Sequence, residues 1–172
     1  MSRFRYLLYT IMSMGILLLI YIFLKQLLAG IIISIFIVVN MIIASYKRFL
    51  KIPVEIELLT LGIVVSTYRY GIKAGLVVAI LGGILSFIVG LNFSPFSFPM
   101  LLGYMITALV SYQFRYFNIS VIGILATLAS NAFIFTIYHF VFDYDIFKNL
   151  SFSISNIIIN SILFLNLAPL LI

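Results

Sequence analysis

Long apolar runs separated by short polar breaks dominate the chain. A helix that crosses the bilayer core needs about 20 mostly apolar residues, and it satisfies its own backbone hydrogen bonds where water is absent. Strands of a membrane barrel would give short segments of alternating hydrophobicity, which this sequence does not show. The pattern therefore predicts an all-α, polytopic membrane helix bundle. Its apolar segments are Tyr6–Leu24, Leu27–Tyr46, Val54–Tyr68, Ala74–Leu91, Met100–Phe114, Ile119–Val141 and Phe152–Leu171.

The breaks between these segments are too short to form a soluble domain. Several contain proline or glycine, the residues that turns favour. We therefore expect a single transmembrane domain over residues 1–172. The segments Val54–Tyr68 and Met100–Phe114 are short for a full crossing, so we expect six or seven transmembrane helices. The breaks are Lys25-Gln26, Lys47–Pro53, Arg69–Lys73, Asn92–Pro99, Gln113–Arg115 and Asp143–Asn149.

The composition requires lipid around much of the surface. Hydrophobic residues make up 65% of the 172 residues and charged residues 8%, against about 45–50% and about 25% in soluble domains. A chain of this size cannot hide such an excess in its interior. Arg3 and Arg5 precede the first apolar run as in a signal peptide. Because the run reaches Leu24 without a small-residue cleavage site, we expect a retained first span and a multi-pass protein of the cell membrane.

The positive charge is interpreted as loop charge. The formal net charge is +6, and the ten Lys and Arg residues lie mainly between the apolar runs, where such charges influence topology. We expect the lipid bilayer as a partner and no nucleic acid, while the orientation stays open. The chain has no Cys, which excludes disulfides and Cys-based chemistry. It also lacks a nucleophile elbow, a phosphate loop and a zincin helix, so we expect no enzyme activity and no cofactor.

A stripe of small residues marks one helix face. Gly71, Gly75, Ala79 and Gly83 are spaced four apart, so they form a groove without large side chains. Close backbone packing of this kind drives helix association in lipid. The groove serves either packing within the chain or docking of a partner subunit.

Polar stripes occur on two consecutive segments near the C-terminus. Asn131, Tyr138 and His139 share roughly one face of the first, and Asn156 and Asn160 share a face of the second. Two such stripes can face each other. They either hold the helices together by hydrogen bonds or line a polar pocket for a small solute.

Acidic residues offer one further candidate for a binding site. Glu55 and Glu57 are two residues apart and point in different directions on a helix, so they form no catalytic pair. Glu57 lies deeper in the apolar run, and ionisable groups within spans are costly and usually functional. Solvation at the membrane interface is the alternative. His139 near Asp143 and Asp145 matches no metal-binding motif, so we expect no metal site.

The stretch from Pro53 to Gln113 resembles the substrate-binding S components of energy-coupling-factor transporters. The resemblance is carried by Tyr70-Gly71-Ile72-Lys73-Ala74-Gly75, by the loop Ser94-Pro95-Phe96-Ser97-Phe98-Pro99 and by the span that opens Met100-Leu101-Leu102-Gly103-Tyr104. It implies a small six-helix protein that captures a vitamin-like solute or metal ion from outside. Such a protein docks on a transmembrane T component driven by two ATPase subunits. The Ala-x-x-x-Ala motif that many S components carry in the first span is missing here.

The same stretch is also similar to the MreD-like membrane subunit of the rod-shape elongation machinery. That resemblance implies a scaffold with no substrate of its own. The Asp that this family often shows in the span corresponding to Ala74–Leu91 is absent, and Ser86 lies nearby.

We therefore expect a membrane-embedded solute-binding subunit of a micronutrient transporter, with a non-catalytic scaffold as the alternative. The expected solute-binding residues are Asn131, Tyr138, His139, Asn156, Asn160 and Glu57. The expected partner-docking residues are Gly71, Gly75, Ala79 and Gly83.

Overall fold

The structure is a computed structural model that describes the backbone of residues 2–50, 58–91 and 93–172. Every regular element in these ranges is a helix, and they contain no strand, which confirms the all-α prediction. The chain divides into two compact units, Met1–Ile32 and Ile33–Ile172. The prediction of a single domain over the whole chain stays a prediction.

The first helix, α1 (Ser2–Leu50), has 49 residues and runs through the position where a break was predicted. The prediction of two separate helices around Lys25-Gln26 is therefore wrong. Lys and Gln are both good helix formers, and neither glycine nor proline is present there to end the helix. In the first unit the described apolar side chains face outward, as Leu17 and Phe23 do with 65% and 63% of their surface exposed.

Helix α2 (Leu59–Tyr70) has only 12 residues and forms the centre of the second unit. Its residues Leu59–Thr67 are all buried. One side packs with Ile122 and Phe164, and another packs with Val78 and Tyr104. A helix surrounded by other helices does not need the length of a lipid-facing span, because its neighbours exclude lipid from its ends.

A helix with a π-helical interruption follows α2. It consists of α3 (Ile72–Val77), the π-helical turn η1 (Val78–Gly82) and α4 (Gly83–Val89). The tight turn between α2 and α3 depends on Gly71, whose φ of 88° is easily adopted only by glycine. Its backbone N–H closes α2 by donating to the carbonyl of Thr67 at 2.9 Å.

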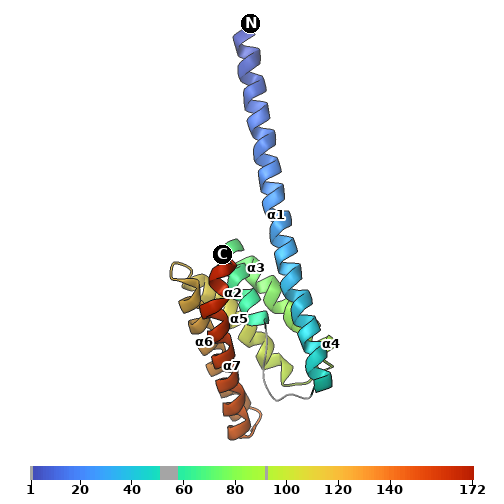
Figure 1. Ribbon diagram of the computed structural model, residues 1–172, viewed down its shortest axis with the longest axis vertical. Coiled ribbons are helices and arrows are strands. Elements are labelled where there is room, and N and C mark those ends of the chain that lie inside the picture. The colour runs from blue at the N-terminus through green and yellow to red at the C-terminus, as the bar shows by residue number, and fades with distance from the viewer. Residues whose placement is uncertain (1, 51–57, 92) are drawn as a thin grey trace. The chain divides into compact units, whose positions relative to one another are not determined.

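Three further helices complete the second unit: α5 (Ser97–Gln113), α6 (Ile119–Phe140) and α7 (Ile146–Asn166). A short 3₁₀ turn, η2 (Ala168–Leu170), follows. Helix α6 packs along both α5 and α7, and α6 and α7 run side by side in Figure 1. Side-chain caps start both helices: the Asn118 side chain accepts from the N–H of Ser120, and that of Asp145 accepts from the N–H of Lys148.

Four helices within the described residues are long and apolar enough to cross a membrane, which supports a membrane protein. Helices α2 and α5, with 12 and 17 residues, are shorter than the usual span. The expected number of six or seven crossings is not confirmed. The four candidate spans are Leu17–Tyr46, Ile72–Val89, Ile119–Phe140 and Ile146–Leu170.

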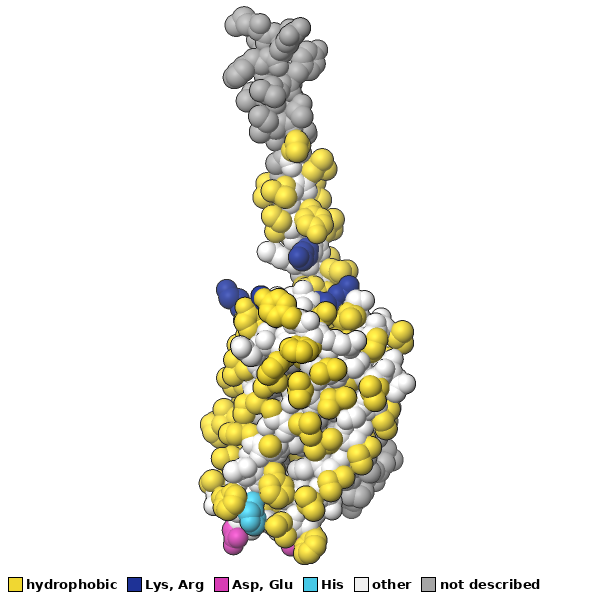
Figure 2. Space-filling view, turned by 90° about the vertical axis from the view of Figure 1, so that its left-hand side faces the viewer, with side chains coloured by type: hydrophobic (Ala, Val, Ile, Leu, Met, Phe, Trp, Pro, Cys, Tyr) yellow, Lys and Arg dark blue, Asp and Glu magenta, His cyan; other side chains and the backbone are white. Residues whose placement is uncertain are grey.

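Charged side chains of the second unit occupy the ends of its helices. Asp143 and Asp145 lie in the α6–α7 turn, and Lys148 follows in the first turn of α7. Figure 2 shows the acidic side chains near the histidine at one end of the bundle. Arg69 lies in the last turn of α2 and donates to the carbonyl of Leu171 at 3.1 Å. Arg115 follows α5, where a hydrogen bond to the Tyr116 hydroxyl raises the pKa of the guanidinium above its ordinary value.

Candidate functional site

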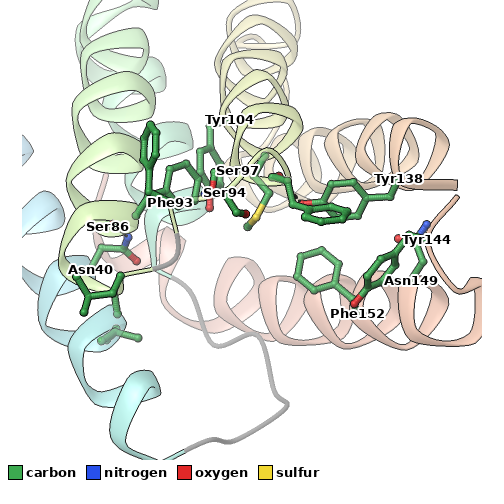
Figure 3. Close-up of a pocket in the computed structure, with 16 residues that line it drawn as sticks. Asn40, Ser86, Phe93, Ser94, Ser97, Tyr104, Tyr138, Tyr144, Asn149 and Phe152 are labelled. Atoms are coloured by element: carbon green, nitrogen blue, oxygen red, sulfur yellow. Dashed lines mark hydrogen bonds between the residues drawn. The ribbon is translucent and has the colours of Figure 1, made fainter. Parts of the chain in front are cut away.

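A pocket of about 570 Å³ lies within the second unit. Its walls come from α1, α4, α5, α6, α7 and the loops at the same end of the bundle (Figure 3). This volume is within the range of about 300–1,000 Å³ that is typical of small-molecule sites. The described lining residues are Asn40, Ile43, Ala44, Ser86, Phe87, Leu91, Phe93, Ser94, Phe96, Ser97, Met100, Tyr104, Tyr138, Tyr144, Asn149 and Phe152.

One side of the pocket contains a chain of hydrogen bonds between α1 and α4. The Asn40 amide Nδ2 donates to the Ser86 hydroxyl at 2.6 Å, and that hydroxyl donates to the carbonyl of Gly82 at 2.6 Å. Asn40 has only 3% of its surface exposed. Because a buried amide in an apolar helix is stable only when it is hydrogen-bonded, this chain holds α1 against α4.

The other side is built from aromatic rings. The ring of Phe96 lies 5.7 Å from that of Tyr138 at an interplanar angle of 82°, and 5.7 Å from that of Tyr144 at 62°. The Tyr138 hydroxyl donates to the carbonyl of Phe96 at 2.7 Å, which joins α6 to the loop before α5. Edge-to-face contacts of this kind favour fixed ring orientations. The aromatic side is therefore well ordered within the pocket.

Asn149 stands beside this aromatic side, next to Tyr138 and Tyr144 (Figure 3). Its amide Nδ2 donates to the carbonyl of Phe135 on α6 at 3.0 Å. Its Oδ1 is buried without a hydrogen-bond partner. Among the described lining residues, no other side chain has a buried polar atom without a partner.

The amide and hydroxyl groups of the pocket can exchange hydrogen bonds with a bound molecule, and the rings can stack on it. The part of the chain that the structure describes contributes no charged side chain to the lining. It also contains no group of three or more His, Cys, Asp or Glu residues that could hold a metal ion. The described arrangement therefore suits binding of a small organic molecule.

The structure brings three of the predicted polar residues together, but outside the pocket lining. Asn131 on α6 donates from Nδ2 to Oδ1 of Asn156 on α7 at 2.9 Å. Asn160 donates to the same oxygen at 3.0 Å. All three side chains are buried between the two helices. The bond from Asn131 to Asn156 joins the two helices, which is the first of the two predicted roles, whereas Asn160 bonds to Asn156 within α7.

The remaining predicted solute-binding residues have different positions. Tyr138 lines the pocket, as its prediction requires. His139 is adjacent in sequence but not among the described lining residues, and its ring contacts Phe135 and Phe140. Successive residues on a helix are about 100° apart, so the side chains of Tyr138 and His139 point in different directions. Glu57 lies outside the described residues.

The small-residue stripe is mostly covered by helices of the same chain. A side chain at Gly75 would meet Thr67 of α2, and one at Gly83 would meet Leu101 of α5. Ala79 is fully buried. A partner subunit therefore has no access to these three residues in this structure. Gly71 differs, since a Cβ atom there would meet nothing within 4 Å.

The most informative pocket residues were missed by the sequence analysis. Asn149 lies seven residues before Asn156 and on the same face of α7, so extending the polar stripe toward the N-terminus of this helix would have found it. Asn40 is a single amide within an apolar run, which is itself a signal in a membrane helix. Nothing in the sequence indicates that Asn40 and Ser86 contact each other.

Comparison with known proteins found no matching family model, no matching curated protein and no matching solved structure. The class of protein is defined by the structure alone: a helical protein with several candidate membrane spans and a cavity of the size that small molecules occupy.

Proposed function

We propose that this protein is a membrane-embedded solute-binding subunit of an uptake transporter. The observation that carries the proposal is the pocket of about 570 Å³, which five helices and their loops surround at one end of the bundle. It combines amide and hydroxyl groups with aromatic rings, the combination that binding sites for small organic molecules use. A vitamin-like solute is bound there, and no chemistry is performed on it.

In this proposal the protein works with a transmembrane partner subunit and ATPase subunits. The partner needs a face other than the small-residue stripe, because Gly75, Ala79 and Gly83 are buried against α2 and α5.

Native mass spectrometry of the gently solubilised protein tests the proposal. We expect a discrete non-lipid adduct that is weakened by replacing Tyr138 with alanine. The control is Asn166→Ala, because the Asn166 side chain is exposed and bonds only within its own helix. Protein that carries lipid alone, also after incubation with a panel of vitamins, would contradict the proposal.

A scaffold subunit of a cell-shape or cell-wall elongation complex is the second candidate. The observation that favours it is the hydrogen bond from Asn131 of α6 to Asn156 of α7, whose oxygen also accepts from Asn160 within α7. Polar stripes with this role hold helices together and require no solute. Co-purification of elongation proteins with an empty pocket would support the scaffold, whereas ATPase subunits and a bound solute would support the transporter subunit.

A further inference from the structure

We infer that the pocket selects a planar ring compound that carries an N–H or O–H donor, and that Asn149 Oδ1 accepts the hydrogen bond from this donor. The inference rests on the proposed function and adds the chemical class of the solute. It also assigns a specificity-determining role to Asn149, which the sequence stripes did not include.

The orientation of the Asn149 amide is fixed by its partner. The carbonyl of Phe135 can only accept a hydrogen bond, so the amide nitrogen must be the atom that faces it, at 3.0 Å. The oxygen of the same amide is left as an acceptor without a partner, although the residue has 0% of its surface exposed. Buried polar atoms are rarely left unpaired, and a donor group of a bound molecule would satisfy this one.

The side chains around Asn149 favour a flat molecule. Tyr138 and Tyr144 have ring centroids 5.8 Å apart, and Phe96 lies 5.7 Å from each of them. Phe152 lines the pocket one helical turn after Asn149. Ring faces and edges that are fixed by contacts with each other present a preorganised surface for stacking, and stacking requires a planar partner.

Other buried acceptors do not offer the same site. Asn131, Asn160 and Ser153 also have a buried side-chain oxygen without a partner. None of the three is among the described lining residues of the pocket. Among the described lining residues, only Asn149 has a buried side-chain oxygen without a hydrogen-bond partner. We therefore expect Asn149 to distinguish solutes with an N–H or O–H donor from solutes without one.

The test uses two probes of the same shape, indole and benzofuran. Both are planar and uncharged, but only indole has an N–H donor, whereas benzofuran has an oxygen at that position. The protein contains no Trp, so the fluorescence of indole can be followed without tryptophan background. Binding is measured by equilibrium dialysis against the full chain in lipid nanodiscs, with empty nanodiscs as the reference for partition into lipid.

We expect indole to bind about fivefold to tenfold more tightly than benzofuran, as one additional net hydrogen bond predicts. Asn149→Ala should remove this preference. Ser153→Ala is the matched control, because Ser153 is also buried on α7, one turn away, with an unpaired oxygen and no place in the described lining. It should leave the preference unchanged.

Asn149→Asp keeps the test valid if the alanine variant does not fold. An ionised aspartate has two acceptor oxygens, and a protonated one can donate to the Phe135 carbonyl while its second oxygen still accepts. The preference for indole should therefore persist in this variant. Equal binding of the two probes to the unmodified protein, or a preference that survives Asn149→Ala, would overturn the inference, as would failure of both probes to bind.

The inference and the proposed function fail in different ways. A non-lipid adduct in native mass spectra, together with no preference for indole, leaves a solute-binding protein with a different solute class. A protein that contains no adduct and binds neither probe contradicts both.

Discussion

Asn131 of α6 and Asn156 of α7 are joined by a hydrogen bond of 2.9 Å from the amide Nδ2 of the first to Oδ1 of the second. The same oxygen also accepts from Nδ2 of Asn160 at 3.0 Å. Asn156 is therefore the shared acceptor of two amides in the buried interface between the helices. This relationship predicts unequal effects of replacing the three residues.

Asn156→Ala should destabilise the protein more than Asn131→Ala. The first change takes the shared acceptor away from two buried amides and leaves an N–H of each unpaired. The second removes the bonds from Asn131 to Asn156 and to the Thr127 carbonyl, but Asn156 Oδ1 keeps Asn160 as its donor. With about 0.6–1.7 kcal/mol for each interhelical or side-chain hydrogen bond in a membrane protein, we expect a loss of about 1–3 kcal/mol for Asn156→Ala and about half of that for Asn131→Ala. Equilibrium unfolding in mixed micelles measures both, with Asn166→Ala as the exposed control. Equal losses in all three variants would contradict the shared-acceptor arrangement.

Replacing Gly71 with alanine should lower the free energy of unfolding although space is available. A Cβ atom at Gly71 or at Gly30 would meet nothing within 4 Å. The two positions differ in backbone conformation, since Gly71 has a φ of 88° and Gly30 lies within α1. We expect Gly71→Ala to cost about 1 kcal/mol and Gly30→Ala to be neutral or stabilising by up to about 1 kcal/mol. Thermal unfolding of the two variants side by side checks the difference.

Gly123→Ala should destabilise the contact between α6 and α7. A Cβ atom at this position would overlap the ring of Phe164, which is fully buried. Overpacking of this kind typically costs about 1–3 kcal/mol. The double variant Gly123→Ala with Phe164→Leu should lose less stability than the two single changes added together, because the smaller side chain makes room. Additive losses in a double-mutant cycle would show that the two residues do not compete for space.

Helix α6 should cross the membrane, so that residues beyond its two ends are accessible from opposite sides. Its 22 residues span about 33 Å, close to the thickness of the hydrocarbon core. Tyr116 and Phe147 lie just beyond its two ends and are 85% and 77% exposed. Since the chain has no Cys, Tyr116→Cys and Phe147→Cys each introduce a single thiol. A membrane-impermeant reagent should label one variant in intact cells and the other only after permeabilisation, and labelling of both in intact cells would exclude a crossing.

The helices at the C-terminal half of the chain follow closely from the apolar pattern. The predicted segment Ile119–Val141 corresponds to α6, and Met100–Phe114 corresponds to most of α5. The predicted start of the last helix at Phe152 is six residues late, because α7 begins at Ile146. The first turns of α7 contain polar residues such as Asn149 that face the pocket, so an apolar-run criterion excludes them.

The N-terminal half shows where the pattern is insufficient. A polar pair such as Lys25-Gln26 interrupts an apolar run without ending a helix, because these straight side chains lose little rotamer freedom in a helix. The short segment around α2 has the composition of a span, yet it is the centre of the bundle. Its environment depends on which helices surround it, and local composition contains no information about that.

The sequence by itself determined the helical class, the membrane-type composition and two polar stripes on consecutive helices, one with Asn131 and the other with Asn156 and Asn160. These properties depend on hydrophobicity and on the helical repeat, which are local. The tertiary structure alone decided that Gly75 and Gly83 face helices of the same chain, and that Asn40 and Ser86 meet across a pocket wall. Contacts between distant segments depend on how whole helices pack, and this is decided by the shape of every interface together rather than by any one segment.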